Sequence, residues 1–310
     1  MTFPNISRRS ALIGGAALPF AAASAPRLAL ADGHAAPSNA IQNTFALGEF
    51  QVSTLLAGTR TVDEGIQDIF GRNVSPEEFA DVSAQNFIPS DKAQFFFTPT
   101  VVRAGADIVL FDAGLSAAGT TAALTSAGIE AADVTIVVIT HMHGDHIGGL
   151  TDDAGNATYP NARYVTGQVE FDHWAAAENE RFDGKVRPFA ENMTFLGDGE
   201  DVVSGITAVS AFGHTPGHMT YMVESGGEGV LLMADTANHY VWSLGYPEWE
   251  VRFDMDKAAA AASRKKILGM VATDKIPLIG YHMPFPGMGY VETRGEGGYR
   301  YVPVSYQTLL

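Results

Sequence analysis

Short apolar runs recur along this chain and end in polar or glycine-containing turns, a pattern typical of strands. In the first half, we expect strands over residues 45–56, 94–102, 108–112, 134–140 and 162–166. In the second half, we expect β-rich sequence over 206–234 and a strand over 276–279. Apolar periodicity and alanine-rich sequence predict helices over 119–127, 168–178 and 255–270. No long or biased linker divides these elements, so we predict one folded domain.

One excursion interrupts the strand pattern between residues 61 and 92. There Ser75-Pro76-Glu77-Glu78 supplies an N-cap, a first-turn proline and a capping-box glutamate for a short helix. Two interpretations of this segment stay open. It could form a lid over an active site, or it could be a solvated helical excursion without such a role.

The first thirty residues resemble an export signal. Residues 7–12 read Ser-Arg-Arg-Ser-Ala-Leu, which resembles a twin-arginine motif, and an A-x-A cleavage site follows at 29–31. We expect a twin-arginine-type signal peptide over residues 1–31, with an ordinary secretory signal as the alternative. The mature protein would then be periplasmic or secreted. The apolar stretch is too short for a stable span, so no stable membrane anchor is expected.

Composition fits an exported protein with a flexible polar leader over residues 32–44 and a folded domain over 45–310. The chain is 46% hydrophobic, enough for a large core. Processing would change the formal net charge from −16 to −19, because Arg8, Arg9 and Arg27 leave with no acidic residue. Such a surface repels phosphate backbones, which argues against nucleic acid as a partner, and disfavours highly anionic substrates. The absence of cysteine fits an oxidising compartment.

The most informative chemistry is His141-Met142-His143-Gly144-Asp145-His146, directly after the apolar run 134–140. Imidazole and carboxylate are ligands of borderline divalent cations such as zinc, and this chain has no competing thiolate. In extended backbone His141 and His143 point the same way, while Asp145 and His146 turn toward a neighbouring ion. Two ions are therefore implied, with a histidine-rich surface loop as the alternative.

Three more candidate ligands each follow a short β-rich run, namely His214, Asp235 and His282. Ligands at the ends of successive strands converge on one sheet edge, which is how a long chain builds a compact site. This convergence strengthens the metal interpretation over the surface-loop alternative.

The full series resembles the metallo-β-lactamase superfamily over about residues 45–305. The resemblance implies an α/β fold, specifically a four-layer αβ/βα sandwich, with two metals at the edge of its packed sheets. The implied ligands are His141, His143 and His214 for the first ion, Asp145, His146 and His282 for the second, and Asp235 as a bridge between them. Asp112 resembles an acid that orients a ligand, although a strand-end turn is equally compatible with its sequence. His218 is expected to support the turn that presents His214.

Within the superfamily, the C-terminal third resembles the methyl parathion hydrolase group, with quorum-quenching lactonases as more distant relatives. The likeness lies in residues 252–256, the alanine-rich stretch 257–270, residues 282–287 and residues 298–304. These are framework and rim segments, so they indicate a subgroup better than a substrate.

Aromatic residues are candidates for an apolar pocket beside the metals, with ordinary packing as the alternative for each. The candidates are Phe96, Trp174, Phe182 and Phe285, together with His239, which lies four residues after Asp235. We favour Trp174, because its segment follows the strand expected beside the metal-binding loop.

The predicted cofactor is a pair of divalent ions, most plausibly Zn²⁺, with Mn, Fe or Co as alternatives. A hydroxide bridging two such ions would attack a polarised carbonyl or phosphorus, and Asp145 would orient it or return a proton to the leaving group. We therefore expect a hydrolase of small neutral esters, lactones such as acyl-homoserine lactones, or organophosphate triesters. The bridging role that the resemblance implies for Asp235 argues against a β-lactam hydrolase.

Export and acidity fit a glyoxalase-type thioesterase poorly, but both that class and the β-lactam hydrolase remain alternatives. A metal-binding pseudoenzyme is the alternative outside the enzymes. A homodimer is also possible on this sequence.

Overall fold

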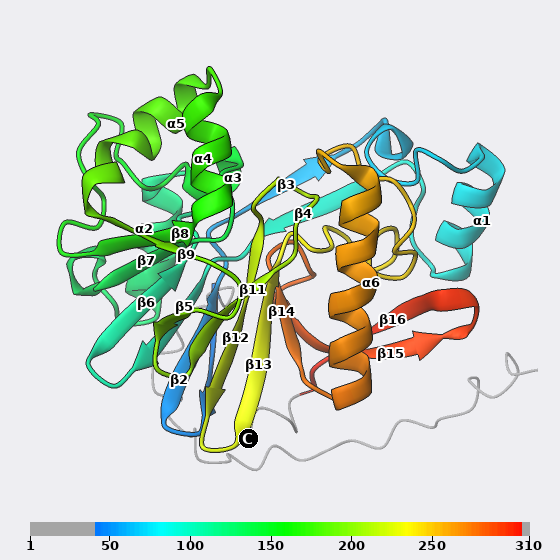
Figure 1. Ribbon diagram of the computed structural model, residues 1–310. Coiled ribbons are helices and arrows are strands. Elements are labelled where there is room, and N and C mark those ends of the chain that lie inside the picture. The colour runs from blue at the N-terminus through cyan, green and yellow to red at the C-terminus, as the bar shows by residue number, and fades with distance from the viewer. Residues whose placement is uncertain (1–40, 306–310) are drawn as a thin grey trace, which may run out of the picture. The chain divides into compact units, whose positions relative to one another are not determined.

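The computed structural model of the protein describes residues 41–305. Within that range the chain forms two seven-stranded sheets and a separate ribbon of β3 (Gly58–Val62) and β4 (Ala93–Phe97) (Figure 1). The expected signal peptide and residues 32–40 of the expected leader lie outside the described residues. In the part of the chain that the structure describes, no helix is long and apolar enough to cross a membrane.

The first sheet changes from antiparallel to parallel pairing across its width. In spatial order its strands are β1 (Gln42–Leu47), β2 (Phe50–Leu55), β5 (Thr100–Ala104), β6 (Asp107–Phe111), β7 (Ile136–Ile139), β8 (Arg163–Gly167) and β9 (Met193–Leu196). Pairing is antiparallel from β1 to β6 and parallel from β6 to β9. The loops that follow β6, β7 and β8 therefore leave from the same edge of this sheet.

The second sheet is mostly antiparallel. In spatial order its strands are β10 (Asp201–Val203), β11 (Ile206–Ser210), β12 (Met219–Ser225), β13 (Glu228–Ala234), β14 (Leu278–Gly280), β15 (Met288–Arg294) and β16 (Gly298–Pro303). Since β12 is antiparallel to both β11 and β13, and β14 is parallel to β13, strands β11, β13 and β14 all run in one direction. Their carboxyl ends share an edge.

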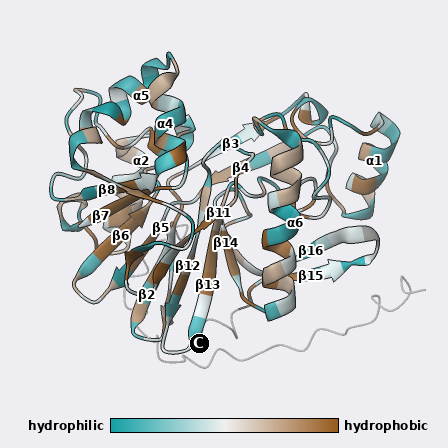
Figure 2. Ribbon diagram, viewed as in Figure 1, coloured by the Kyte–Doolittle hydropathy of each residue, from teal (hydrophilic) through white to brown (hydrophobic). Residues whose placement is uncertain are grey.

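The two sheets face each other across the main hydrophobic core, where Val52 and Val138 of the first sheet meet Val223 and Leu232 of the second. Helices α2 (Ala117–Ser126), α4 (Gln168–Ala176) and α5 (Glu180–Lys185) cover the other face of the first sheet, and α6 (Lys257–Asp274) covers the second. Figure 2 shows hydrophobic residues concentrated in the strands between these helices. The order of layers confirms the predicted αβ/βα sandwich. Short helical turns are α3 (Gly144–Ile147), η1 (Ile66–Asp68), η2 (Ala131–Asp133), η3 (Arg187–Asn192) and η4 (Gly295–Gly297).

The excursion predicted over residues 61–92 packs into a third apolar cluster beside β3 (Gly58–Val62) and β4 (Ala93–Phe97). Its helix α1 (Pro76–Gln85) begins where the capping pattern predicts, because the Ser75 side chain accepts a hydrogen bond from the Glu78 amide. The Phe79 ring stacks on Trp242 with 5.1 Å between ring centroids. This packing corrects the interpretation of a merely solvated excursion.

Two predicted strands are each divided in the structure. The stretch 45–56 is a hairpin that turns at Gly48, whose φ of 56° suits glycine, and its first strand already begins at Gln42. The expected leader is therefore too long at its C-terminal end. The stretch 94–102 changes sheets at Thr98 and Pro99, so that β4 pairs with β3 while β5 pairs with β2 and β6. Proline cannot donate to a ladder, which explains the break.

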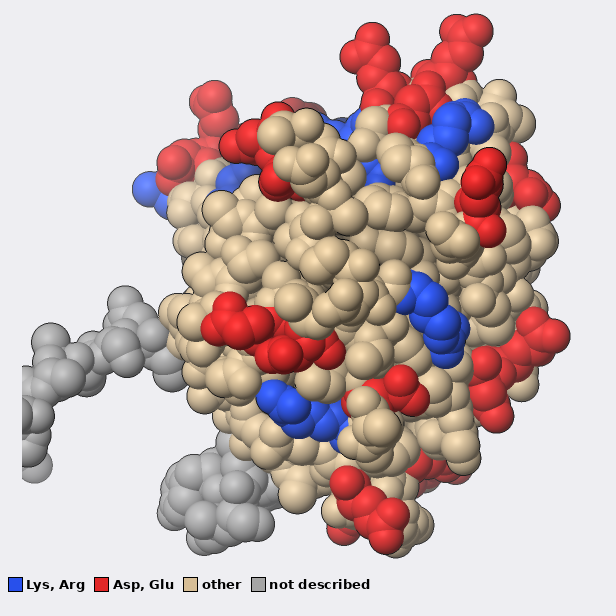
Figure 3. Space-filling model, turned by 90° about the vertical axis from the view of Figure 1, so that its left-hand side faces the viewer, with Lys and Arg blue, Asp and Glu red and all other residues tan. Residues whose placement is uncertain are grey.

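Charged side chains are scattered over the molecular face drawn in Figure 3, and acidic groups cover more of it than basic groups. This face shows no continuous basic area of the kind that a polyanion requires. It agrees with the formal net charge of −16.

Candidate metal centre

The candidate metal ligands leave the carboxyl ends of strands in both sheets. The loop and short helix α3 after β7 carry His141, His143, Asp145 and His146. His214 follows β11, Asp235 follows β13, and His282 follows β14. Because these strands end at one rim of the sandwich, residues up to 141 positions apart in the chain become neighbours, and the structure brings all of the predicted ligands together.

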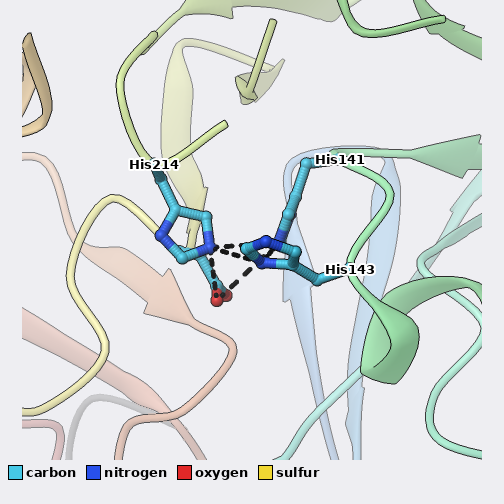
Figure 4. A group of neighbouring side chains, drawn as sticks. His141, His143 and His214 are labelled. Atoms are coloured by element: carbon cyan, nitrogen blue, oxygen red, sulfur yellow. Dashed lines mark hydrogen bonds and ion pairs between the residues drawn. The ribbon is translucent and has the colours of Figure 1, made fainter. Parts of the chain in front are cut away.

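His141, His143 and His214 form what we call the first group. Their ring nitrogens are separated by 3.1 Å between His141 Nε2 and His143 Nδ1, 3.0 Å between His143 Nδ1 and His214 Nε2, and 3.2 Å between His214 Nε2 and His141 Nε2. Figure 4 shows the three rings pointing toward one another. Ligands about 2.0 to 2.1 Å from a tetrahedral zinc ion stand roughly 3.3 Å apart, so this spacing suits one ion.

The other ring nitrogens of the first group determine where its lone pairs point. His214 Nδ1 lies 2.9 Å from the Asp254 carboxylate, and donation there leaves Nε2 of the neutral ring as an acceptor. The Thr140 hydroxyl donates to Asp112, so it accepts from His141 Nδ1 at 3.1 Å. The lone pairs of His214 Nε2 and His141 Nε2 therefore face each other without a hydrogen between them. A cation bound between the two nitrogens stabilises this arrangement, whereas a hydrogen bond cannot form.

Asp145, His146 and His282 form the second group. The Asp145 Oδ2 atom lies 3.4 Å from His282 Nε2 and 3.7 Å from His146 Nε2. Asp235 reaches both groups, since Oδ2 lies 3.3 Å from His214 Nε2 and 3.2 Å from His282 Nε2. Its Oδ1 atom lies 3.2 Å from His146 Nε2, and both atoms are buried without a hydrogen bond of good geometry among the described residues. Two buried ligand atoms that face each other in this way fit a bound cation.

Asp112 orients the second group. Its Oδ2 atom lies 2.8 Å from His146 Nδ1, and its Oδ1 atom accepts the Thr140 amide at 2.9 Å. The Asp112 backbone has a φ of 64°, a strained value for a residue with a side chain. The residue thus stands in a strand-end turn and also contacts a candidate ligand, so the two interpretations of its sequence are compatible.

His218 contacts the strand end that leads to His214 and, in addition, a second candidate ligand. Its Nδ1 atom lies 3.1 Å from the Ala211 carbonyl, and its Nε2 atom accepts the Asp235 amide at 3.1 Å. His218 therefore positions the bridging candidate Asp235 as well as the loop that contains His214.

The electrostatics of the centre favour positive charge. Burial opposes ionisation of Asp235, but His282 and His146 hold the pKa of its carboxyl well below the ordinary value. Burial also opposes ionisation of Asp145, yet His146 and His282 lower its pKa to about 2. Burial lowers the pKa of His143 to about 3, which keeps a neutral lone pair available. Anionic carboxylates beside a neutral imidazole suit a divalent cation.

A cavity of about 810 Å³ opens over the centre. His143, Asp145, Asp235 and His282 lie in its wall. The remaining lining residues are Arg60, Val62, Glu64, Gly65, Asp68, Ile69, Phe95, Phe97, Leu115, Gly144, Arg181, Arg252 and Phe253. Five of these belong to β3, η1 and the link between them, and Ile69 directly follows η1, so the start of the excursion borders the site. Its movement as a lid stays a prediction.

The predicted pocket aromatics lie elsewhere, and that expectation is corrected. On β4 the alternation of side chains directs Phe95 and Phe97 toward the cavity and Phe96 away from it. Phe182 is fully buried in the core under the first sheet. Phe285, half-buried beyond His282, is also outside the lining.

His239 and Trp174 are also outside the lining. His239 stacks on Trp242 with 4.0 Å between ring centroids. The Trp174 ring approaches His143 edge-on, at 6.1 Å between ring centroids. Trp174 therefore contacts a candidate ligand but is outside the lining of this cavity.

Sequence reasoning did not identify Asp254 as a partner of His214. Asp254 is buried, and its second oxygen accepts from Arg264 Nη1 at 2.8 Å. In the sequence, Asp254 stands in a segment that contains two other charged residues, Arg252 and Asp256, so no local pattern distinguishes it. Its burial and its contacts with His214 and Arg264 reveal its role.

Comparison with known proteins places the chain among metal-dependent hydrolases by sequence. A profile of the metallo-beta-lactamase superfamily matches residues 98–276, more than half of the chain. N-acyl homoserine lactonase AiiA of Bacillus thuringiensis subsp. kurstaki is 28% identical over 149 residues, which are 47% of this chain and 54% of that protein. A Bacillus sp. N-acyl homoserine lactonase is 28% identical over 145 residues, 46% of this chain and 53% of that protein. The chain thus spans about half the length of the curated relatives it matches.

Solved structures share the fold over nearly their whole length. AidC, described as a dizinc quorum-quenching lactonase in complex with a product, superposes with a TM-score of 0.78 at 24% identity. The hydrolase AbOPH superposes with a TM-score of 0.79 at 21% identity. Each alignment covers 86% of this chain and 99% of the other. Together with the profile match, the convergence of ligands at the sandwich rim leads to one conclusion: this chain belongs to the metallo-beta-lactamase superfamily.

Proposed function

We propose that this protein is a hydrolase that uses two divalent zinc ions to open lactones or cleave neutral carboxylic esters. The observation that carries the proposal is the pair of ligand groups that share Asp235 at the floor of a large cavity. The described activity of AidC and AiiA supports a lactone as the first substrate class to test.

When bound, two such ions would polarise the substrate carbonyl and lower the pKa of a water molecule into the neutral range. Asp145 is the candidate for proton transfer, because its side chain is 23% exposed whereas that of Asp235 is 4% exposed. The pKa of Asp145 is lowered to about 2, so its side chain is an ionised hydrogen-bond acceptor at neutral pH. The Tyr281 hydroxyl donates to the Asp145 carbonyl at 2.5 Å and holds this residue in place.

The cavity lining combines apolar side chains with three arginines and, besides the candidate ligands, the two acids Glu64 and Asp68. Phe95, Phe97 and Phe253 supply apolar surface, and Arg252 lies 5.1 Å from the centre of the Phe253 ring. Arg60, Arg181 and Arg252 make no hydrogen bond or ion pair through their guanidinium groups among residues 41–305. Unpaired donors beside apolar surface suit a substrate with an acyl or aryl body and carbonyl oxygens. A neutral phosphotriester, whose P=O group also accepts hydrogen bonds, is the second candidate.

Kinetics on a substrate panel tests the proposal. The panel contains short- and long-chain acyl-homoserine lactones, an aryl ester, methyl parathion, a cephalosporin and lactoylglutathione. We expect lactone hydrolysis that a chelator abolishes and added zinc restores. A protein that binds two ions per chain and hydrolyses none of these compounds would support the pseudoenzyme alternative instead.

A further inference from the structure

A buried carboxylate outside both ligand groups lies directly behind the metal centre. Glu170 stands in the first turn of α4, three residues after β8 ends, and its side chain is fully buried. A buried carboxylate needs hydrogen-bond donors, because burial removes the water that would otherwise stabilise it. The hydrogen-bond donors to the Glu170 carboxylate identify the segments that this residue positions.

Each Glu170 oxygen accepts two hydrogen bonds. The Oε1 atom accepts the Met142 amide at 2.9 Å and Trp174 Nε1 at 2.7 Å. The Oε2 atom accepts the Thr215 hydroxyl at 2.7 Å and the Gly217 amide at 2.9 Å. One carboxylate thus joins two loops that are about seventy residues apart in the chain.

Both of those loops belong to the first group. Met142 lies between His141 and His143, and Thr215 directly follows His214. The Gly217 end of the second loop is seated tightly on α4, since a Cβ on Gly217 would stand 2.1 Å from the Glu170 amide nitrogen. Glu170 therefore sets the separation of the backbone segments that carry all three histidines.

The second group is held by other residues. His146 donates to Asp112, and His282 Nδ1 lies 2.8 Å from the Phe96 carbonyl. The backbone of Asp145 is held by Tyr281. None of these contacts passes through Glu170, so its influence on the two groups is unequal.

We propose that Glu170 is a positioning residue that pre-organises the first group, so that its loss selectively weakens binding of the first ion. This inference rests on the proposed two-ion centre. A glutamine in its place could accept hydrogen bonds at only one end, and its amide N–H groups would face two donors at the other. Residues that orient metal ligands from outside the coordination shell typically contribute 10- to 100-fold to metal affinity.

Single-ion backgrounds separate the two groups. The variant His282→Ala leaves the first group as the stronger zinc site, and His143→Ala leaves the second. We expect Glu170→Gln to raise the zinc Kd about 10- to 100-fold in the His282→Ala background and less than threefold in the His143→Ala background, measured by competition with a chromogenic chelator. Glu180→Gln, at an exposed glutamate that begins α5, is the matched control and should change neither Kd.

Milder variants cover the case in which Glu170→Gln does not fold. Trp174→Phe and Thr215→Val each remove one donor and should weaken the first site in the same direction, by a smaller factor. Equal weakening in both backgrounds, or unchanged affinity of the first site, would overturn the inference. If the wild-type protein binds two zinc ions and Glu170→Gln binds both with the same affinity, this inference alone is refuted. A wild-type chain that binds no zinc refutes the proposed function as well.

Discussion

His214 and Asp254 form a buried pair in which Nδ1 of the imidazole lies 2.9 Å from Oδ1 of the carboxylate. Arg264, also buried, holds the other carboxylate oxygen and donates to the Pro247 and Trp249 carbonyls. The chain of contacts therefore runs from α6 to a candidate metal ligand. It fixes the tautomer that presents His214 Nε2 to the ion.

We expect Asp254→Asn to unfold more easily, because it leaves the Arg264 charge buried without its anionic partner. Breaking a buried ion pair typically costs about 3 to 5 kcal/mol of unfolding free energy. Urea denaturation measures this loss. The matched control is Glu292→Gln, which breaks a pair with Arg300 whose side chains are 50% and 68% exposed, and should cost less than about 1 kcal/mol. Similar costs for the two variants would contradict a structural role for the buried pair.

Asp235→Ala should release at least one equivalent of metal and remove most hydrolytic activity, because Asp235 lies within 3.3 Å of ligands in both groups. Elemental analysis of the purified variant and lactone kinetics measure the two effects. Two retained equivalents with normal turnover would refute its role as the bridge.

Arg181 is the cavity arginine that lies against the metal-binding loop. A Cβ on Gly144, between His143 and Asp145, would stand 1.6 Å from Arg181 Nη1. A guanidinium at this position can donate to a carbonyl oxygen of a bound acyl lactone, a contact that contributes about 1.5 kcal/mol or more. We expect Arg181→Gln to lower kcat/KM for an acyl-homoserine lactone about tenfold, mainly through KM.

The matched control for that variant is Arg187→Gln. Arg187 lies nearby on the surface, where it pairs with Asp183 at 2.7 Å. Arg187 is outside the cavity lining. The KM of the Arg187→Gln variant for the lactone should therefore stay within twofold of the wild-type value. An equal effect of the two substitutions would exclude a specific contact between Arg181 and substrate.

His239 should make the stability of the fold depend on pH. Burial lowers the pKa of His239 to about 3, whereas the unfolded chain protonates near the ordinary value of 6.5. The stabilising effect of the neutral side chain is therefore complete above pH 6.5 and is lost as the pH falls from 6.5 toward 3. The variant His239→Asn should reduce the slope of unfolding free energy against pH by about 1 kcal/mol per pH unit between pH 6 and 5.

Urea unfolding at several pH values, with chelator present in every sample, measures that slope without a contribution from metal binding. The Asn side chain can still accept the Val241 amide that His239 Nδ1 accepts at 3.1 Å. Parallel curves for the wild-type protein and the variant would show that His239 does not titrate in the way its burial implies.

Export by the twin-arginine route is a proposal that rests on Arg8, Arg9 and the A-x-A site at 29–31. Combined Arg8→Lys and Arg9→Lys substitutions should retain a folded, active precursor in the cytoplasm. Cell fractionation and immunoblotting measure the distribution. Unimpaired appearance of processed protein outside the cytoplasm would favour an ordinary secretory signal.

The sequence by itself determined the series of candidate ligands, and the resemblance of that series to a known superfamily implied the layers of the fold. His141 to His146 lie within six residues, so their local spacing already brings several ligands together. The capping pattern at Ser75 likewise acts between neighbours in the chain and predicts the start of α1 correctly. Such features depend on local geometry, which a sequence contains directly.

Only the tertiary structure decided which side chains face the cavity and which carboxylates are buried. Alternation on β4 separates Phe96 from Phe95 and Phe97, but the packing of β3 and β4 selects the face that meets the metals. The sequence does not distinguish Glu170 and Asp254 from surface acids, because some of their hydrogen-bond donors come from other segments of the chain. Hydrogen bonds and burial depend on contacts across the fold, so local periodicity could not predict these roles.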